Sequence, residues 1–357
     1  MRVAIVAASS RWIGGQGVQA DLLVRDWLDD PEVNVRFIPI DPILPAWLRW
    51  VERIPVMRSF IRSPLYFAAL WSGTKDVDVV HIFSASYSSF LISSMPAWVA
   101  AISRGKKTLF HYHSGEARDH LRHSVVARRV LGQADAIMVP SLYLANVFHE
   151  FGLAVQVLPN VVHSSQFRYR ARRPLLPRLV CTRGFHPYYS VDIVVRAFDR
   201  LKKGHPESRL CLVGKGPAEK RIRDLVRTLE LRDVAFAGPV SHSKIAQYYE
   251  ENDIFINASW VDNMPVSILE AFASGTPVVT TAPEGIRYIV EHERTGLLCE
   301  PGDWRALAEN VTRLLQDPQF AQRIALNAHE ESRRYQWDAV RAQWLCVYRK
   351  LCNLSDV

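Results

Sequence analysis

Two successive segments of this chain repeat one pattern, a short apolar strand followed by a polar turn and a helix, and this pattern restricts the fold most. Residues 253–258 form an apolar run typical of a buried strand, and residues 262–265 form a turn whose proline suits the first position of a helix. Residues 266–273 carry apolar side chains at helical spacing, and Gly275 suits the helix end. Residues 276–281 predict the next strand, with a further turn and helix behind it. Such units predict an α/β fold with a parallel sheet, and doubly wound sheets bind ligands at the carboxyl edge of their strands.

Two acidic residues stand in the first of these units. Asp262 lies at the mouth of the turn, and Glu270 lies two helical turns further on among apolar neighbours. A carboxylate in apolar surroundings needs hydrogen-bond donors, which are either local side chains or the hydroxyl groups of a ligand. The free N–H groups at the helix start would attract phosphate or sugar oxygens. The simpler alternative is a helix with one surface acid.

Length and composition favour two globular domains and an anionic partner. A chain of 357 residues is too long for one ordinary core, and its contents of 48% hydrophobic and 22% charged residues are those of a globular protein. The formal net charge of +8 fits nucleotide phosphates, lipid diphosphates or an acidic bilayer. Nucleic acid is not expected as a partner, since no recognition module and no isolated basic block is present.

The cysteines and the N-terminal segment indicate the compartment. The five cysteines are odd in number and lack CxxC spacing, which favours thiols in a reducing environment over disulfides or a metal site. Residues 3–8 suit a first strand and not a signal peptide, and no apolar stretch is long enough to span a membrane. We therefore expect a cytoplasmic protein, with peripheral association at the inner face of the membrane as the open alternative.

Residues 43–71 are the basis for that alternative. This segment carries a wide apolar face that includes Trp47 and Trp50, surrounded by arginines at 49, 53, 58 and 62. A basic, tryptophan-bearing amphipathic segment is typical of a membrane interface. The other interpretation is a pair of packed helices whose arginines are solvated.

Further apolar runs complete the expected domain organisation. The first domain is predicted over 1–166, a linker rich in arginine and proline over 167–178, a second domain over 179–333, and a last helix within 334–357. Strands are expected at 2–7, 34–38, 78–83, 108–113, 133–139 and 155–160 in the first domain, and at 179–182, 209–213 and 234–239 in the second, before the two already described.

The segment from Leu179 to Asp303 resembles the C-terminal domain of retaining GT-B glycosyltransferases, and the preceding half resembles that family more loosely. The resemblance is to the family 4 type, or group 1 glycosyltransferases, which includes bacterial polysaccharide and lipid-linked glycan synthases. Its Glu-x7-Glu motif is matched by Glu270 as the second acid, while Asp262 replaces the first and is one methylene shorter. The family has an arginine at Arg183 and a lysine where this chain has Tyr189. The implied fold has two Rossmann-like doubly wound domains with a cleft between them and a C-terminal helix that crosses back to the first domain.

The resemblance also implies roles for individual residues. Arg183 would neutralise the leaving diphosphate, Asp262 would orient the donor sugar, and His113 at the end of a strand would contact the transferred sugar. His111, on the same face of that strand, is more consistent with a core residue. Glu116 and Arg118, beside His113, are assigned to the acceptor. The expected donor-binding residues are Gly14, Gly15, Arg183, Lys215, Gly238, Val240, Met264, Pro265, Val266, Ser267 and Glu270.

The implied reaction is retaining transfer of a hexose from a nucleotide-diphosphate sugar, with UDP or GDP as the nucleotide. The acceptor would be a saccharide or a lipid-linked hydroxyl, in bacterial cell-surface polysaccharide synthesis. No cofactor and no metal are expected, because no Asp-x-Asp motif stands at a strand end and protein cations would replace a metal. The alternatives are a non-catalytic nucleotide-sugar-binding protein, a glycan phosphorylase or donor hydrolase, and a dehydrogenase. The last is disfavoured by the incomplete glycine fingerprint at 14–17.

Overall fold

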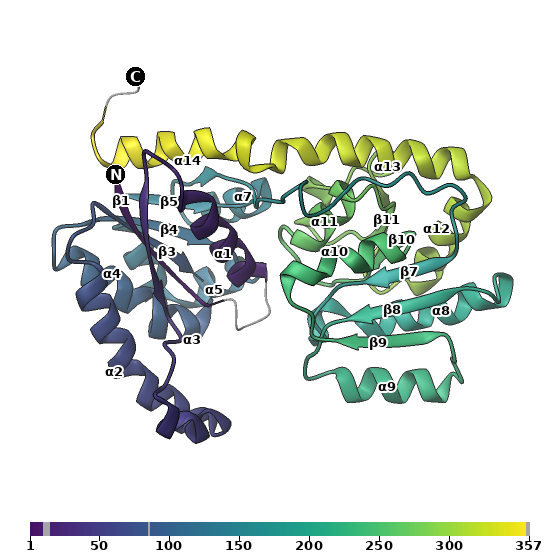
Figure 1. Ribbon diagram of the computed structural model, residues 1–357, viewed down its shortest axis with the longest axis horizontal. Coiled ribbons are helices and arrows are strands. Elements are labelled where there is room, and N and C mark those ends of the chain that lie inside the picture. Colours follow the sequence, from purple (N-terminus) through teal and green to yellow (C-terminus); the bar gives the residue numbers. More distant parts are fainter. Residues whose placement is uncertain (10–14, 85, 355–357) are drawn as a thin grey trace. The chain divides into compact units, whose positions relative to one another are not determined.

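A computed structural model describes residues 1–9, 15–84 and 86–354, with the side chains of 46, 49, 52, 53, 55, 56 and 58–60 outside that description. The chain divides into two compact units (Figure 1). Unit 1 contains Met1–Leu158 and Arg341–Val357, and unit 2 contains Pro159–Val340. The first division therefore lies earlier in the chain than the predicted boundary at 166, and the last helix contributes to unit 1.

The sheet of unit 1 is parallel throughout and has the strand order β2-β1-β3-β4-β5-β6. The order changes direction between β1 and β3, which is the switch point of a doubly wound sheet. The strands are β1 (Arg2–Ala7), β2 (Asn34–Pro39), β3 (Val79–Ser84), β4 (Lys107–Tyr112), β5 (Ala136–Val139) and β6 (Gln156–Val157).

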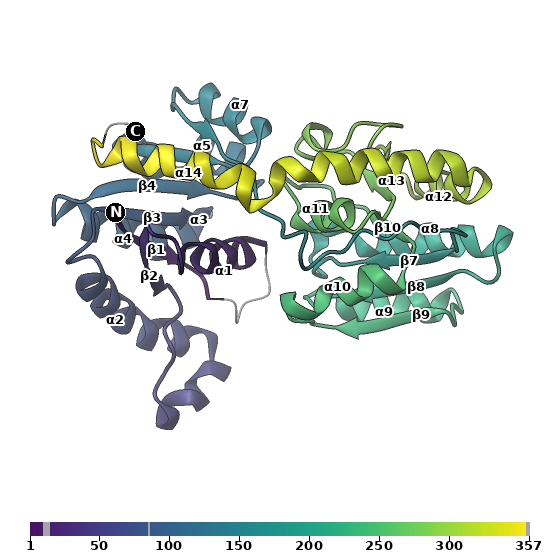
Figure 2. The same cartoon turned by 45° about the horizontal axis from the view of Figure 1, so that its top comes forward.

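Helices cover both faces of this sheet because successive strand residues point to opposite sides. Val80 and Ile82 of β3 join the core cluster beneath α2, α4 and α7. His81, between them, contacts Trp344 and Tyr348 of α14 on the other face, and Figure 2 shows α14 running over β4. The helices are α1 (Gly15–Trp27), η1 (Ala46–Arg53), α2 (Pro55–Gly73), α3 (Tyr87–Ser89), η2 (Phe90–Ser94), α4 (Met95–Ile102), α5 (Ala117–His123), α6 (Val125–Gly132), α7 (Leu142–Glu150) and α14 (Trp337–Leu351). The predicted return of the C-terminal helix to the first domain is confirmed by these contacts.

The sheet of unit 2 is also parallel and has the order β12-β11-β10-β7-β8-β9. Counted from the first strand of the unit, this is the order of a Rossmann fold, with its switch point between β7 and β10. The strands are β7 (Arg178–Cys181), β8 (Arg209–Val213), β9 (Val234–Gly238), β10 (Ile254–Asn257), β11 (Val278–Thr281) and β12 (Leu297–Cys299).

Two apolar layers sandwich this second sheet. Leu179 and Cys181 of β7 belong to the cluster under α8, α9 and α12, whereas Val180 belongs to the cluster under α10 and α11. The helices are η3 (Pro187–Tyr189), α8 (Val191–Gly204), α9 (Glu219–Thr228), α10 (His242–Glu251), α11 (Val266–Ala273), η4 (Ile286–Tyr288), α12 (Trp304–Gln316), α13 (Pro318–Ser332) and η5 (Arg333–Tyr335). The α/β fold with two doubly wound sheets is thus confirmed.

Two local expectations differ from the structure. The helix expected after β11 is only the short η4, because the turn closed by Glu291 and Thr295 leads the chain directly into β12. The segment 167–178, expected as an interdomain linker, lies within unit 2. Its Phe167 and Arg172 side chains are buried, and Arg172 donates to the carbonyl oxygens of residues in α10 and just after α11.

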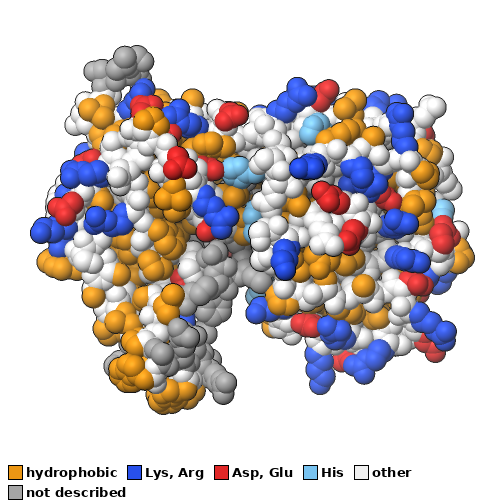
Figure 3. Space-filling view, in the orientation of Figure 1, with side chains coloured by type: hydrophobic (Ala, Val, Ile, Leu, Met, Phe, Trp, Pro, Cys, Tyr) orange, Lys and Arg blue, Asp and Glu red, His pale blue; other side chains and the backbone are white. Residues whose placement is uncertain are grey.

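The segment 43–71 forms η1 and most of α2, and its apolar side chains divide between two sides. Tyr66 and Leu70 of α2 are buried against unit 1, while Trp47 and Trp71 expose 74% and 61% of their surface. Figure 3 shows hydrophobic side chains gathered over this part of unit 1. None of the described helices combines the length and the apolar character needed to cross a lipid bilayer.

Candidate functional site

The loops that follow β7 and β10 carry the central residues of the candidate site in unit 2. These strands are neighbours in the sheet although they lie far apart in the sequence. Because the strand order changes direction between them, their loops leave the sheet edge on opposite sides and open a crevice there. Arg183 follows β7 and Asp262 follows β10, so the topology itself brings these two side chains to one place.

Arg183 and Asp262 form a buried ion pair. Nη2 of Arg183 donates to Oδ2 of Asp262, and the two side chains are only 9% and 10% exposed. The carboxylate also accepts from the hydroxyl of Ser259 at 3.2 Å and from the backbone N–H of Asn263 at 3.0 Å. Burial alone would lower the pKa of Arg183, but the adjacent carboxylate outweighs it and holds that pKa above its ordinary value. The site therefore contains a permanently charged guanidinium.

The start of α11 lies against this pair. Nη1 of Arg183 donates to the hydroxyl of Ser267 at 3.1 Å. Pro265 precedes α11, and its side chain accepts no hydrogen bond from the first N–H groups of the helix. Met264, Val266 and Ser267 are all buried. The arrangement joins a cation to the positive end of a helix, which is a suitable environment for phosphate oxygens.

Glu270 continues the same network deeper in unit 2. Its Oε2 accepts from the hydroxyl of Tyr249 at 2.8 Å, and its Oε1 lies 3.0 Å from Nε2 of His242. The same hydroxyl lies 3.0 Å from the carbonyl oxygen of Ser267, so its one hydrogen is shared between the two acceptors and connects Glu270 to the residue that accepts from Arg183. The sequence left open whether the donors to Glu270 are local side chains or the hydroxyl groups of a ligand, and local side-chain donors are present. Each carboxylate oxygen retains a second lone pair, so a ligand hydroxyl can still bind there.

Tyr189 occupies the position at which the resembling family has a lysine. The guanidinium carbon of Arg183 lies 3.9 Å from the centroid of the Tyr189 ring. Burial raises the pKa of Tyr189 to about 12, so the hydroxyl is neutral at ordinary pH. An aromatic face thus replaces the second cation, and it stabilises the remaining one through a cation–π contact.

The glycine turns of unit 2 allow the three loops at this edge to touch. A Cβ atom on Gly214 would lie 2.3 Å from the carbonyl oxygen of Arg183, so only glycine permits this approach. The backbone N–H of Gly214 donates to the carbonyl oxygen of Gly238 at 2.9 Å. Lys215 is exposed and Val240 is half-buried. Predicted donor-binding positions after β8 and β9 therefore lie beside the loop that carries Arg183.

The remaining predicted residues belong to unit 1. His113 follows β4, its ring stacks on Phe83 with centroids 5.2 Å apart, and burial lowers its pKa to about 3. Glu116 is exposed, and Arg118 forms an ion pair with Glu150 at 2.9 Å.

Gly14, Gly15 and His111 are the other residues of unit 1 for which the sequence made a prediction. Gly15 is the first residue of α1, whereas Gly14 lies outside the described residues. His111 is buried, as expected for a core residue, with its ring centroid 4.0 Å from that of His113.

Tyr249 and His242 are two members of the network that sequence reasoning missed, and the Ser259 hydroxyl that donates to Asp262 is a third. Tyr249 and His242 lie on α10, whose apolar spacing marks Tyr249 only as a core residue. Their connection to Glu270 depends on the packing of α10 against α11, for which the sequence carries no local signal.

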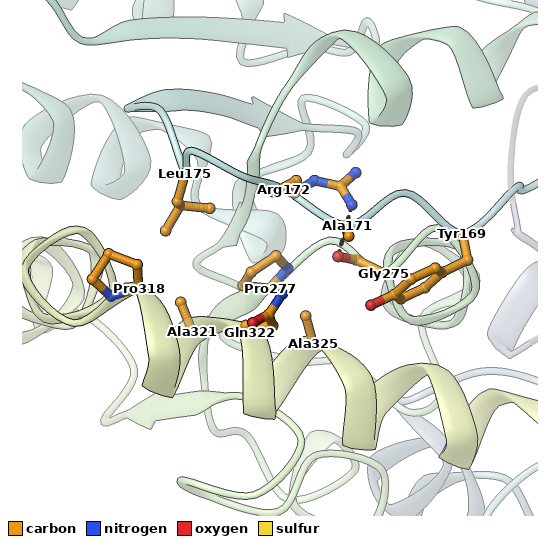
Figure 4. A pocket seen from close by; sticks show the side chains of 10 residues that line it. All are labelled: Tyr169, Ala171, Arg172, Leu175, Gly275, Pro277, Pro318, Ala321, Gln322 and Ala325. Atoms are coloured by element: carbon orange, nitrogen blue, oxygen red, sulfur yellow. Dashed lines mark hydrogen bonds between the residues drawn. The ribbon is translucent and has the colours of Figure 1, made fainter.

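The structure also has a shallow pocket that shares no residue with this network. Figure 4 shows it between the segment after Phe167, the end of α11 and the first turns of α13. The pocket is lined by Tyr169, Ala171, Arg172, Leu175, Gly275, Pro277, Pro318, Ala321, Gln322 and Ala325. Among the described residues, no group of three or more His, Cys, Asp or Glu side chains is placed to hold a metal ion.

Curated relatives of the chain include several enzymes of glycan metabolism. An exopolysaccharide phosphotransferase from Streptomyces coelicolor is 31% identical over 56% of this chain and 21% of its own length. A glycogen synthase from Mycobacterium tuberculosis is 28% identical over 66% of this chain and 59% of its own length. A D-inositol 3-phosphate glycosyltransferase from Acidothermus cellulolyticus is 26% identical over 96% of this chain and 84% of its own length. The chain thus spans less than two thirds of the first two relatives.

Solved structures share the fold over nearly the whole chain. Sucrose-phosphate synthase from Thermosynechococcus elongatus has a TM-score of 0.79 at 21% identity, covering 98% of this chain and 99% of that one. HepE from Anabaena, in complex with UDP-glucose, has a TM-score of 0.78 at 17% identity. The match covers 98% of this chain and 100% of the HepE chain. At these identities the likeness concerns the fold.

Two family models account for most of the sequence. The model described as Glycosyltransferase Family 4 matches residues 5–166, and the model described as Glycosyl transferases group 1 matches residues 176–331. Their boundaries follow the two doubly wound sheets, one model to each. The chain therefore belongs to the group 1 glycosyltransferases of the family 4 type, enzymes with a two-domain GT-B fold.

Proposed function

We propose that this glycosyltransferase moves a hexose from a nucleotide-diphosphate sugar to an acceptor hydroxyl with retention at the anomeric carbon. The observation that carries the proposal is the buried Arg183–Asp262 pair at the start of α11. A departing nucleoside diphosphate gains negative charge in the transition state, and a fixed guanidinium stabilises that charge without reorganisation. The planar guanidinium also suits phosphate oxygens, to which it can donate two hydrogen bonds.

The donor nucleotide is proposed to be UDP or GDP. HepE from Anabaena, which shares the fold, was solved with UDP-glucose, and this supports a nucleotide-sugar donor for the present chain. The base would meet the backbone between Gly238 and Val240. Glu270, positioned by Tyr249 and His242, would bind the ribose hydroxyls through its remaining lone pairs.

Asp262 of unit 2 is the residue proposed to hold the donor sugar, and His113 of unit 1 is proposed separately to contact the transferred sugar. Asp262 would orient the sugar hydroxyls once the donor enters beside Arg183. His113 has a pKa of about 3, so it would act as a neutral imidazole and contribute hydrogen bonds without charge. Its Nε2 is buried and has no hydrogen-bond partner among the described residues.

A saccharide or lipid-linked acceptor is proposed, with a role in bacterial cell-surface polysaccharide synthesis. Glu116 is exposed and could accept from acceptor hydroxyls, while Arg118 is held by Glu150 and would contribute through its remaining N–H groups. Protein cations are proposed to replace a metal ion, so the reaction should be metal-independent.

Association with a membrane surface through 43–71 is part of the proposal. Phe67 and Trp71 on the outer side of α2 expose 52% and 61% of their surface, and Val99 and Ile102 of the neighbouring α4 expose 48% and 44%. Arg104 lies with its guanidinium 4.0 Å from the Trp71 ring centroid. Aromatic side chains beside a cation suit the interface of an anionic bilayer.

The donor is tested by a thermal-shift panel of UDP-, GDP- and ADP-sugars. A cognate donor should raise the melting temperature in proportion to the logarithm of its concentration above Kd. Product formation is then measured with and without saccharide acceptors, in the presence of a chelator. Acceptor-dependent product that persists in chelator supports the proposal, whereas acceptor-independent release of free sugar indicates a hydrolase.

Membrane association is tested by flotation with vesicles of phosphatidylglycerol and phosphatidylcholine. The wild-type protein should float with anionic vesicles, and the Phe67→Ser/Trp71→Ser variant should remain in the dense fractions. Replacement of the similarly exposed Leu142 on α7 by serine is the matched control. Equal flotation of all three proteins would contradict a role for 43–71.

A further inference from the structure

Two exposed aromatic side chains lie on the loops that carry Arg183 and Asp262. Trp260 and Tyr188 expose 52% and 42% of their surface, whereas the nearby Phe185 and Phe255 are buried. Tyr188 lies in η3 after β7, and Trp260 lies in the loop after β10. The backbone N–H of Trp260 donates to the carbonyl oxygen of Tyr188 at 2.8 Å, which joins the two loops at the switch point of the sheet.

Both rings are held in place by their neighbours. The six-membered ring of Trp260 lies over Gly302, where a Cβ atom would come within 2.8 Å of Cζ2 and where φ is +86°. The ring of Tyr188 stacks on His186 with centroids 5.3 Å apart and an interplanar angle of 13°. It also meets the ring of Tyr189 edge-on at 4.5 Å. These rings therefore keep their orientation without a ligand, which reduces the entropy cost of binding.

The contact between Tyr188 and Tyr189 connects these exposed rings to the charged centre. Tyr189 covers one face of the Arg183 guanidinium at 3.9 Å, and Asp262 pairs with the same guanidinium two residues after Trp260. A molecule that lies on Trp260 or Tyr188 is consequently adjacent to the residues proposed to bind the diphosphate and the sugar.

We propose that Trp260 and Tyr188 form a platform on which the pyranose ring of a saccharide stacks. The inference rests on the proposed function, because it extends the same site. A pyranose has one face of C–H groups and a rim of hydroxyls. The electron-rich face of an aromatic ring attracts the C–H groups, while the hydroxyls remain bonded to water and to polar neighbours such as Asp262 and His186.

A saccharide suits this surface better than a lipid chain does. An acyl chain requires a continuous apolar groove, whereas the loops that carry the two rings also carry the charged Arg183–Asp262 pair and the polar His186 on which Tyr188 stacks. The pyranose can come from the donor or from the acceptor, since both present the same stacking face. The experiment below separates these two sources.

The test uses the full chain with Trp260→Ala and Tyr188→Ala, and Trp260→Phe as the variant that keeps a ring. Trp71→Ala, at an exposed tryptophan of unit 1, is the matched control. Binding of UDP and GDP without sugar is measured first by thermal shift. It should be unchanged in every variant, which also shows that each one is folded.

The donor arm compares the affinity of each nucleotide-sugar with that of its nucleotide. If the pyranose comes from the donor, Trp260→Ala and Tyr188→Ala lose about threefold to tenfold of the affinity that the sugar adds, the range for one aromatic stacking contact. The acceptor arm uses saturation-transfer NMR with methyl α- and β-glucosides, galactosides and mannosides. If the pyranose comes from the acceptor, transfer to the ring protons of a glycoside falls in both variants and is retained in Trp260→Phe and Trp71→Ala.

Two results would overturn the platform. One is that neither arm changes in Trp260→Ala and Tyr188→Ala. The other is that the affinity for the bare nucleotide falls as much as that for the nucleotide-sugar, which would mean that the rings stack on the base. Failure of the proposed function looks different, because then no nucleotide or nucleotide-sugar stabilises the wild-type protein at all.

Discussion

Arg183 is covered by Tyr189, whose ring centroid lies 3.9 Å from the guanidinium carbon. In the resembling family this position holds a lysine, which would add a second cation to the site. Here the aromatic face interacts favourably with the guanidinium and limits the directions in which it can point. Arg183 is therefore held by three partners, Tyr189, Asp262 and Ser267.

Removing this aromatic face should weaken donor binding. We expect Tyr189→Ala to reduce the affinity for the cognate nucleotide-sugar about threefold to tenfold. A cation–π contact stabilises by about 0.5–1 kcal/mol at an exposed site and by about 2 kcal/mol at a buried one. Tyr189→Phe keeps the ring and should bind donor as the wild type does. Isothermal titration of each protein with the nucleotide-sugar measures the difference. An equal loss in Tyr189→Phe would assign the effect to the hydroxyl instead.

The Arg183–Asp262 pair should be essential for activity, while its effect on stability depends on whether one partner or both are replaced. Arg183→Leu leaves the buried carboxylate of Asp262 without its cation, and we expect a loss of about 3–5 kcal/mol in the free energy of unfolding. Arg183→Leu/Asp262→Asn removes both charges and should recover a large part of that loss. Product formation should be abolished in both variants. Urea unfolding followed by the circular dichroism signal measures the stability.

A surface ion pair supplies the control for this cycle. Arg221 pairs with Asp192, but its side chain is 71% exposed, so Arg221→Leu should cost only a small fraction of the free energy lost in Arg183→Leu. If the double variant at the site is no more stable than Arg183→Leu alone, the buried charge of Asp262 is not the cause of the instability.

Sequence patterns were sufficient to predict the elements that carry the site. The apolar runs around β7 and β10 and the helical spacing of α11 are strong local signals, and α11 has the bounds Val266–Ala273 that its spacing predicts. The polar residues after each strand are visible in the sequence as well. The fold class follows from these elements and the family follows from the resemblance of residues 179–303, and both are confirmed.

Contacts between distant elements could not be predicted in this way. The pairing of Arg183 with Asp262 depends on β10 lying next to β7, and the capping of Glu270 by His242 depends on the packing of α10. The same limit explains the segment 167–178, whose density of arginine and proline indicates a linker. Its Arg172 instead binds backbone oxygens that only the folded unit 2 brings together.

Arg172 should be a major contributor to the stability of unit 2. Its Nη1 donates to the carbonyl oxygens of Ser274 at 2.8 Å and Gly275 at 2.7 Å, and its Nη2 donates to that of Tyr249 at 2.8 Å. Burial lowers the pKa of Arg172 to about 10, so the group remains charged at neutral pH. Arg172→Ala removes these donors, although the Ser274 oxygen still accepts from the backbone N–H of Arg170 at 3.2 Å, and we expect a loss of about 3–5 kcal/mol in the free energy of unfolding. Urea unfolding measures it.

The neighbouring Arg173 is the control for this prediction. It is exposed and donates to Oε1 of Gln322 on the surface, so Arg173→Ala should leave the unfolding midpoint nearly unchanged. Similar losses for Arg172→Ala and Arg173→Ala would mean that the segment acts through its net charge and not through the buried hydrogen bonds.

Two buried histidines, His81 and His111, and the half-buried His113 should make the stability of unit 1 depend on pH. His81 donates or accepts one hydrogen bond with the hydroxyl of Tyr348 at 2.8 Å, and both ring nitrogens of His111 lack a hydrogen-bond partner among the described residues. Burial lowers the pKa of His81 and of His113 to about 3 and the pKa of His111 well below its ordinary value. In the unfolded chain these groups titrate near about 6.5.

The sign of the effect follows from proton binding. Between about pH 6.5 and pH 3 the unfolded chain binds protons that folded unit 1 excludes, so the free energy of unfolding falls as the pH is lowered through this window. Each histidine contributes a slope of up to about 1.4 kcal/mol per pH unit to the free energy of unfolding.

His111→Leu removes one such group without breaking a described hydrogen bond. It should reduce the slope of the free energy of unfolding between about pH 6 and pH 4.5 by about that amount. Hydrogen exchange of the β3 and β4 amides measures the stability of unit 1 in this range. A slope that is identical in the wild type and in His111→Leu would show that the acid sensitivity of unit 1 comes from its carboxylates and not from the buried histidines.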